Sequence, residues 1–78
     1  MSEKMTKSER LAVLRSVAEA LQEQQYDPIR QIRGFLLSGD PTYIPDYKNA
    51  RAQISEIDRA DLLDDLLITY LSKGGSES

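Results

Sequence analysis

Apolar residues recur at helical spacing in two long segments, one near each end of the chain. In the first segment the apolar stripe consists of Leu11, Leu14, Val17, Ala18 and Leu21, with Val13 and Ala20 widening it. Thr6 is followed three positions later by Glu9, which matches a capping box at a helix start, and Ser8 is a competing cap. The pattern predicts a helix over residues 8–24.

Two Asp-Pro pairs organise the middle of the chain. In Asp27-Pro28 the aspartate is a strong helix cap and the proline suits the first helical position, so a second helix is predicted over residues 28–38, ending at Ser38-Gly39. Gly34 lies inside this helix, where glycine costs about 1 kcal/mol relative to alanine. It therefore indicates either a close approach by another helix or a tolerated weakness.

Asp40-Pro41 repeats the cap-and-proline pair, but Pro45 follows four residues later and would break a helix that began there. We expect residues 40–45 to form a single helical turn or a rigid loop that carries Tyr43 and Ile44 inward. A third helix is predicted over residues 46–54, carrying Tyr47, Ala50, Arg51 and Ile54.

The last helix has more apolar positions than one narrow stripe can hold. Its start is predicted at Ser55 or Asp58, its end at Lys73 before two glycines, and its apolar residues are Leu62, Leu63, Leu66, Leu67, Ile68, Tyr70 and Leu71. A helix that is apolar over more than half of its circumference has to be covered from two sides. We therefore predict a homodimer whose interface contains Leu63, Leu66, Leu67 and Tyr70.

No segment alternates between apolar and polar residues as a strand would, so the predicted fold class is all-α. The expected architecture is a compact bundle of four to five short helices, in a homodimer that is either intertwined or face-to-face. With 78 residues the chain is expected to form a single helical domain over residues 1–78, with flexible tails at 1–6 and 74–78.

Composition and charge exclude several kinds of chemistry and partner. Cysteine and histidine are both absent, which excludes disulfides, thiolate chemistry and the usual zinc ligands, and no cofactor is expected. The net charge is −3 and the basic residues are scattered, a pattern that argues against a nucleic-acid partner. No apolar run reaches the roughly 20 residues needed to insert into a membrane, and the charged start lacks a signal peptide. A cytoplasmic protein is expected.

Candidate catalytic groups are few. Asp61, Asp64 and Asp65 could be read as the carboxylate cluster of a small hydrolase, although such a group is usually the solvated face of a helix. No phosphate-binding glycine loop is present. We therefore expect no enzyme, and keep a small helical nucleic-acid-binding module as the alternative function.

Three arginines and four tyrosines are the candidate binding residues. Arg30, Arg33 and Arg51 either form a clamp for an anion or partner, or make ion pairs with Asp27, Asp40 or Asp46 that hold the central turns. The tyrosines lie either at the edge of the core or on a partner-facing surface; they are Tyr26, Tyr43, Tyr47 and Tyr70.

The central segment resembles the IreB family. The resemblance is carried by Tyr26-x-Pro28-Ile29-x-Gln31-Ile32-x-Gly34, then Leu37-Ser38-Gly39-Asp40-Pro41-x-Tyr43-Ile44-Pro45, then Asn49-Ala50-Arg51-x-x-Ile54, and it continues through Arg59 to Tyr70-Leu71. Members of this family are small cytoplasmic regulatory phosphoproteins of Gram-positive bacteria. The resemblance implies an all-helical homodimer without catalytic activity.

In the characterised branch of that family, the protein is a substrate of a membrane Ser/Thr kinase. There it acts as a negative regulator in the cell-envelope stress response, which includes intrinsic cephalosporin resistance. The resemblance therefore implies a Ser/Thr protein kinase and a further protein, of unknown identity, as partners beside a second copy of the chain.

The family's phosphorylation falls on threonines in a longer N-terminal segment with an F-T-x-x-T-like stretch. This chain has only Thr6 there, with Ser2 and Ser8 nearby. Thr6 is thus either a phosphoacceptor or only the helix cap. The two roles are compatible, because a phosphate at a helix N-terminus is electrostatically favoured.

Overall fold

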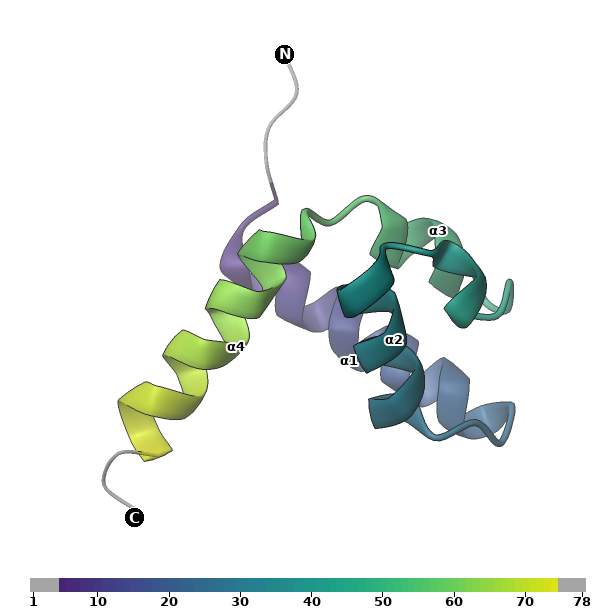
Figure 1. Cartoon of the computed structure of the whole chain (residues 1–78), viewed down its shortest axis with the longest axis horizontal. Helices are drawn as coiled ribbons and strands as arrows, with labels where there is room; N and C mark the ends of the chain where they lie inside the picture. The colour runs from purple at the N-terminus through teal and green to yellow at the C-terminus, as the bar shows by residue number, and fades with distance from the viewer. Residues whose placement is uncertain (1–4, 75–78) are drawn as a thin grey trace.

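The computed structural model describes residues 5–74, and these residues contain four α-helices, one short 3₁₀ helix and no strand. The elements are α1 (Lys7–Glu23), α2 (Pro28–Ser38), η1 (Pro41–Tyr43), α3 (Ala50–Ser55) and α4 (Arg59–Gly74). The all-α prediction is confirmed. The molecule is flat, with extents of 37 × 37 × 20 Å, and α4 extends away from the other helices (Figure 1).

Capping residues determine where the first two helices begin and where α2 ends, as predicted. At the start of α1, the Glu9 N–H donates to Thr6 Oγ1 at 3.1 Å and the Thr6 N–H donates to Glu9 Oε1 at 2.9 Å, which completes the capping box. At the start of α2, Asp27 Oδ1 accepts from the Ile29 N–H at 3.1 Å. Gly39, at φ 77°, ends α2 in the left-handed conformation that glycine adopts without strain.

The core lies where α1 meets α2, η1 and α3. Its buried residues are Val17, Ala20, Leu21, Phe35, Ile44, Ala50 and Ile54, and Val13, Leu14, Ile32, Leu36 and Tyr47 pack around them. Three of the four helices thus share one interior. By contrast, α4 packs mainly on α1.

The turn after α2 differs in part from its prediction. Asp40 Oδ1 accepts from the Thr42 N–H at 3.0 Å and so caps η1, the expected single turn. Ile44 is fully buried, but Tyr43 is 40% exposed, so only one of the two side chains points inward. The Tyr43 ring lies against Gly34, so close that a Cβ at this position would clash with the ring. The close approach that Gly34 indicated is therefore made by a side chain of the short 3₁₀ helix η1.

The third helix is shorter than predicted. It begins at Ala50 instead of residue 46, because Lys48 and Asn49 have φ values of 50° and 63°, outside the right-handed helical region. The Ala50 N–H donates to the Tyr47 carbonyl oxygen at 2.9 Å and closes this turn. Nothing in the residue types of this segment excluded a helix.

Asp58 caps α4, the second of the two alternatives. Its Oδ1 accepts from the Ala60 N–H at 2.9 Å, whereas the Ser55 hydroxyl donates back to the Arg51 carbonyl at 2.7 Å. Arg59 Nη1 donates to the Leu36 carbonyl at 3.0 Å, which ties the start of α4 to the end of α2. Most of the tails expected at 1–6 and 74–78 lie outside the described residues; Thr6 caps α1, and Gly74 is the last residue of α4.

Gly34→Ala is expected to lower the free energy of unfolding by about 1–2 kcal/mol, because the new methyl group displaces the Tyr43 ring and this outweighs the better helix propensity of alanine. Urea unfolding measures the change. In a Tyr43→Ala background the same substitution is expected to be neutral or stabilising. An equal loss in both backgrounds would show that the ring is not the cause.

Candidate functional site

An apolar groove runs between α2 and α4 over the middle of α1. It encloses about 470 Å³ and is lined by Leu14, Ala18, Pro28, Ile29, Ile32, Arg33, Leu36, Leu37, Leu63 and Leu66. Arg33 is the charged member of this set. The groove therefore offers a surface on which another apolar side chain or helix can be buried, with one cation at its margin.

The walls of this groove expose large apolar side chains. Ile29 and Leu37 of α2 are 75% and 79% exposed, and Leu63 of α4 is 41% exposed. Single exposed apolar residues are common on proteins, but neighbouring ones around a groove are typical of an interaction site.

The apolar surface continues along α4 beyond the groove. Leu67, Ile68, Tyr70 and Leu71 are each more than half exposed. The predicted interface set follows this path: Leu63 and Leu66 line the groove, and Leu67 and Tyr70 lie farther along the helix. Within the chain, α1 covers only one side of α4, so the surplus apolar surface that the sequence indicated is present. The homodimer itself stays a prediction.

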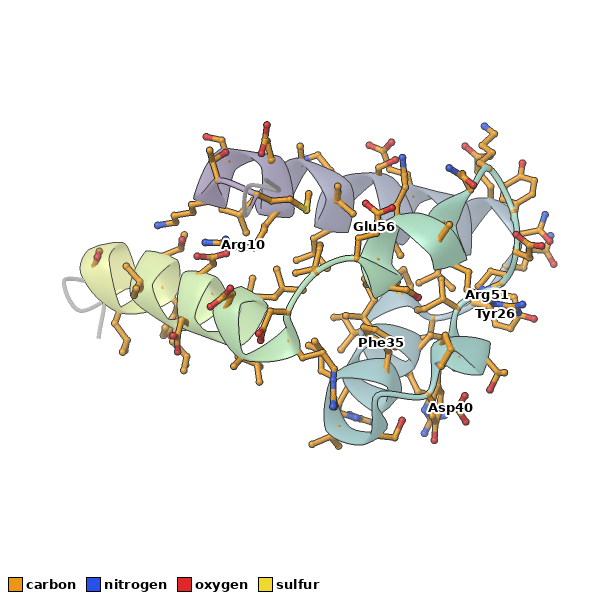
Figure 2. The ribbon with its side chains drawn as sticks, turned by 90° about the horizontal axis from the view of Figure 1, so that it is seen from above. Arg10, Tyr26, Phe35, Asp40, Arg51 and Glu56 are labelled. Atoms are coloured by element: carbon orange, nitrogen blue, oxygen red, sulfur yellow. The ribbon has the colours of Figure 1, made fainter. Side chains whose placement is uncertain are left out.

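One ion pair fastens α4 to α1. Arg10 donates from Nε to Asp65 Oδ2 at 2.5 Å and from Nη2 to Asp65 Oδ1 at 3.0 Å, a two-pronged contact between residues 55 positions apart. Its third nitrogen, Nη1, donates to the Met5 carbonyl at 2.6 Å. Figure 2 shows Arg10 between the two helices. Asp65 is only 4% exposed, whereas the sequence pattern placed it on a solvated face.

The Arg10 guanidinium lowers the pKa of Asp65 by hydrogen bonding, against the opposing effect of burial. A catalytic carboxylate that acts as a general base near neutral pH needs a raised pKa instead. Asp65 is also fully engaged by its partner. The hydrolase hypothesis therefore loses Asp65 from its three candidate carboxylates.

Arg30 and Arg33 lie one turn apart on α2, whereas Arg51 lies on α3. Arg51 donates from Nε to the Ile44 carbonyl at 2.8 Å and so supports the turn after η1, while Arg33 lines the groove. Arg30 is exposed on α2. No contact between described residues brings the three together as a single clamp, so the clamp stays a prediction.

No ion pair between described residues joins any of these arginines to Asp27, Asp40 or Asp46. Asp27 and Asp40 accept backbone N–H groups as caps. The pKa of Asp40 is lowered chiefly by hydrogen bonds from Thr42, and Arg51 adds only a minor electrostatic contribution.

Several residues of the central motif hold the backbone in place. The Arg59 guanidinium lies 2.8 Å from where a Cβ of Gly39 would stand, so a side chain there would displace this flexible group, and the positive φ of 77° favours glycine. The Tyr47 hydroxyl donates to Glu23 Oε1 at 2.8 Å, and Lys48 Nζ lies 2.9 Å from the same oxygen. Tyr47 is thus a tyrosine of the core edge, whereas Tyr26 and Tyr70 are exposed.

Neither a metal site nor a membrane-spanning helix is present in the part of the chain that the structure describes. No group of three or more carboxylate-bearing residues is placed to hold a metal ion. No helix there is both long and apolar enough to cross a bilayer.

Comparison with known proteins identifies the family. The sequence profile described as IreB regulatory phosphoprotein matches residues 1–72. The chain belongs to the IreB family. A UPF0297 protein of Ruminiclostridium cellulolyticum is 48% identical over 65 residues, which cover 83% of this chain and 74% of that relative. Membership in the IreB family gives the chain a regulatory role and does not favour the nucleic-acid-binding alternative.

The ion pair between Arg10 and Asp65 predicts acid sensitivity of the contact between α1 and α4. Because the folded pKa of Asp65 lies below its ordinary value of 3.8, the stabilisation is present above that value and is lost as the pH falls through the folded pKa. The urea midpoint is expected to fall steeply below about pH 4, and less steeply in Asp65→Asn, which has already lost the pair at neutral pH. Asp64→Asn, at an exposed position of α4, is the control. Parallel pH profiles for Asp65→Asn and the parent would contradict this role.

Proposed function

We propose that this IreB-family chain is a non-enzymatic regulatory protein that acts by protein–protein binding as a homodimer. The observation that carries the proposal is the apolar surface that begins in the groove and continues along the exposed face of α4. Such a surface on so small a domain gains most from a partner that covers it from outside.

A second copy of the chain suits this surface because the groove and α4 are complementary. Each copy carries both an apolar groove and an α4 of 16 residues, about 24 Å long, with an apolar side. In a two-fold dimer, α4 of each copy lies on the groove of the other, so both surfaces are buried at once. Either an intertwined or a face-to-face arrangement satisfies this requirement.

We infer the finer role from the characterised branch of the family. The protein is a cytoplasmic substrate of a Ser/Thr protein kinase and a negative regulator of the cell-envelope stress response, including intrinsic cephalosporin resistance. Thr6 is the proposed phosphoacceptor: it is exposed, and its backbone is extended, at φ −78° and ψ 166°, immediately before α1. An exposed, extended residue beside a helix end is accessible to a kinase.

Light scattering at micromolar concentration is expected to give the mass of a dimer. Leu67→Glu places a charge on the exposed apolar face of α4 and is expected to weaken the dimer at least tenfold, because the charge would be buried in the interface. Ala52→Glu, at an exposed position of α3, is the matched control. A monomeric parent, or equal dissociation of both variants, would contradict the proposed interface.

Phosphate mapping of the protein purified from its own bacterium tests the kinase-substrate role. Phosphate is expected on Thr6 and absent from Thr6→Ala. Deletion of the gene is expected to raise cephalosporin resistance, and the parent gene to restore the original level. Unphosphorylated Thr6 in stressed cells would remove the kinase from the proposal, and unchanged resistance would remove the envelope role.

A further inference from the structure

An arginine at the start of α1 joins that helix to the middle of α4. Arg10 lies one turn beyond Thr6, and its guanidinium is shared between the Met5 carbonyl and the buried carboxylate of Asp65. The residue whose modification is proposed above therefore neighbours the contact that fastens α4.

We propose that the Arg10–Asp65 ion pair is a latch that phosphorylation of Thr6 opens, freeing α4 from α1 and reshaping the apolar groove. The inference rests on the proposed function in one respect, the choice of Thr6 as phosphoacceptor. The ion pair explains how a charge added at the N-terminal end of α1 can change the shape of the binding surface.

The Arg10 guanidinium contacts the backbone next to Thr6, the residue proposed to be phosphorylated. Arg10 Nη1 already donates to the carbonyl of Met5, the residue that precedes Thr6, at 2.6 Å. A phosphate carries between one and two negative charges and three strong acceptor oxygens, so it is a better partner for a guanidinium than a backbone carbonyl. It therefore competes with Asp65 for the same donors.

The local charges favour opening. The electrostatic field at Arg10 comes from Asp65, Asp61 and Asp58, all on or at the start of α4, and Lys7 adds a smaller positive contribution at Asp65. Glu9 also faces Thr6 through the capping box. A phosphate on Thr6 adds negative charge close to these carboxylates, and the added charge repels α4.

The shape of the groove depends on the position of α4 because two of its lining residues belong to that helix. Leu63 and Leu66 line the groove and flank Asp65 along the chain. When Arg10 turns to the phosphate, the Asp65 carboxylate is left buried without its partner, a state that is strongly unfavourable. Movement of α4 away from α1 hydrates this carboxylate and carries Leu63 and Leu66 with it.

The test uses the full chain with phosphothreonine installed at position 6, so that no kinase is required. Backbone hydrogen exchange and the NMR signal of the Arg10 side-chain Nε–H are recorded. Loss of the Asp65 hydrogen bond is expected to shift the Arg10 signal, and amides of α4 are expected to exchange about tenfold faster while those of α3 stay unchanged.

Phosphoserine at Ser8 is the matched control. It adds the same charge to the same helix end, but two residues after Thr6, about 200° around the helix and away from Arg10. Asp65→Asn tests the route itself. Without phosphate this variant is expected to show the fast α4 exchange, and a phosphate on Thr6 is expected to change it by less than twofold.

The outcomes separate this inference from the function on which it rests. An unchanged Arg10 signal, or equal effects of phosphate at positions 6 and 8, overturns the latch even if Thr6 is phosphorylated in the cell. Conversely, a latch that opens with installed phosphate stands even if cellular Thr6 carries none. Light scattering on the same samples shows whether a change in dimerisation accompanies the exchange.

Discussion

The small size of the hydrophobic core limits how many helices this molecule can bury. Seventy-eight residues form one small core, which α1, α2, η1 and α3 fill, and little of it remains for a fourth long helix. The chain nevertheless ends in a helix that is apolar on most of its sides. Since α1 covers only one of these sides, the remainder of α4 faces outward, and the groove beside it is left open. The interaction surface is thus a direct result of the small size of the domain.

The parts of the fold that sequence reasoning predicted well are those that local chemistry determines. The capping box of Thr6 and Glu9, the Asp27-Pro28 start and the glycine after Ser38 each act within one helical turn, so the residue types alone locate α1 and α2. The third helix begins four residues later than predicted because Lys48 and Asn49 have left-handed φ values. Asparagine is enriched in that region, so Asn49 carried a signal, whereas Lys48 carried none. Tyr43 was expected inside, yet its ring covers Gly34 from the outer side.

The candidate site was also only partly predictable from the sequence. The apolar excess of α4 could be read from spacing, since Leu63, Leu66, Leu67 and Tyr70 repeat at helical intervals. The groove could not, because its walls come from three helices whose relative positions no local pattern describes. The contact of Arg10 with Asp65 joins residues 55 positions apart, and the sequence grouped Asp65 with its exposed acidic neighbours. One signal was available: Asp65 falls between Leu62 and Leu66 on the apolar side of its helix.

The hydrogen bond from Arg59 to the Leu36 carbonyl makes the start of α4 a pivot for the rest of the helix. It holds the base of the helix against the end of α2, while the rest of the helix extends about 24 Å from that base. A rotation of only about 10° about such a fulcrum displaces the far end by about 4 Å, close to the width of a side chain. Small changes near the base are thereby amplified along α4, and the residues farthest from the core travel the greatest distance.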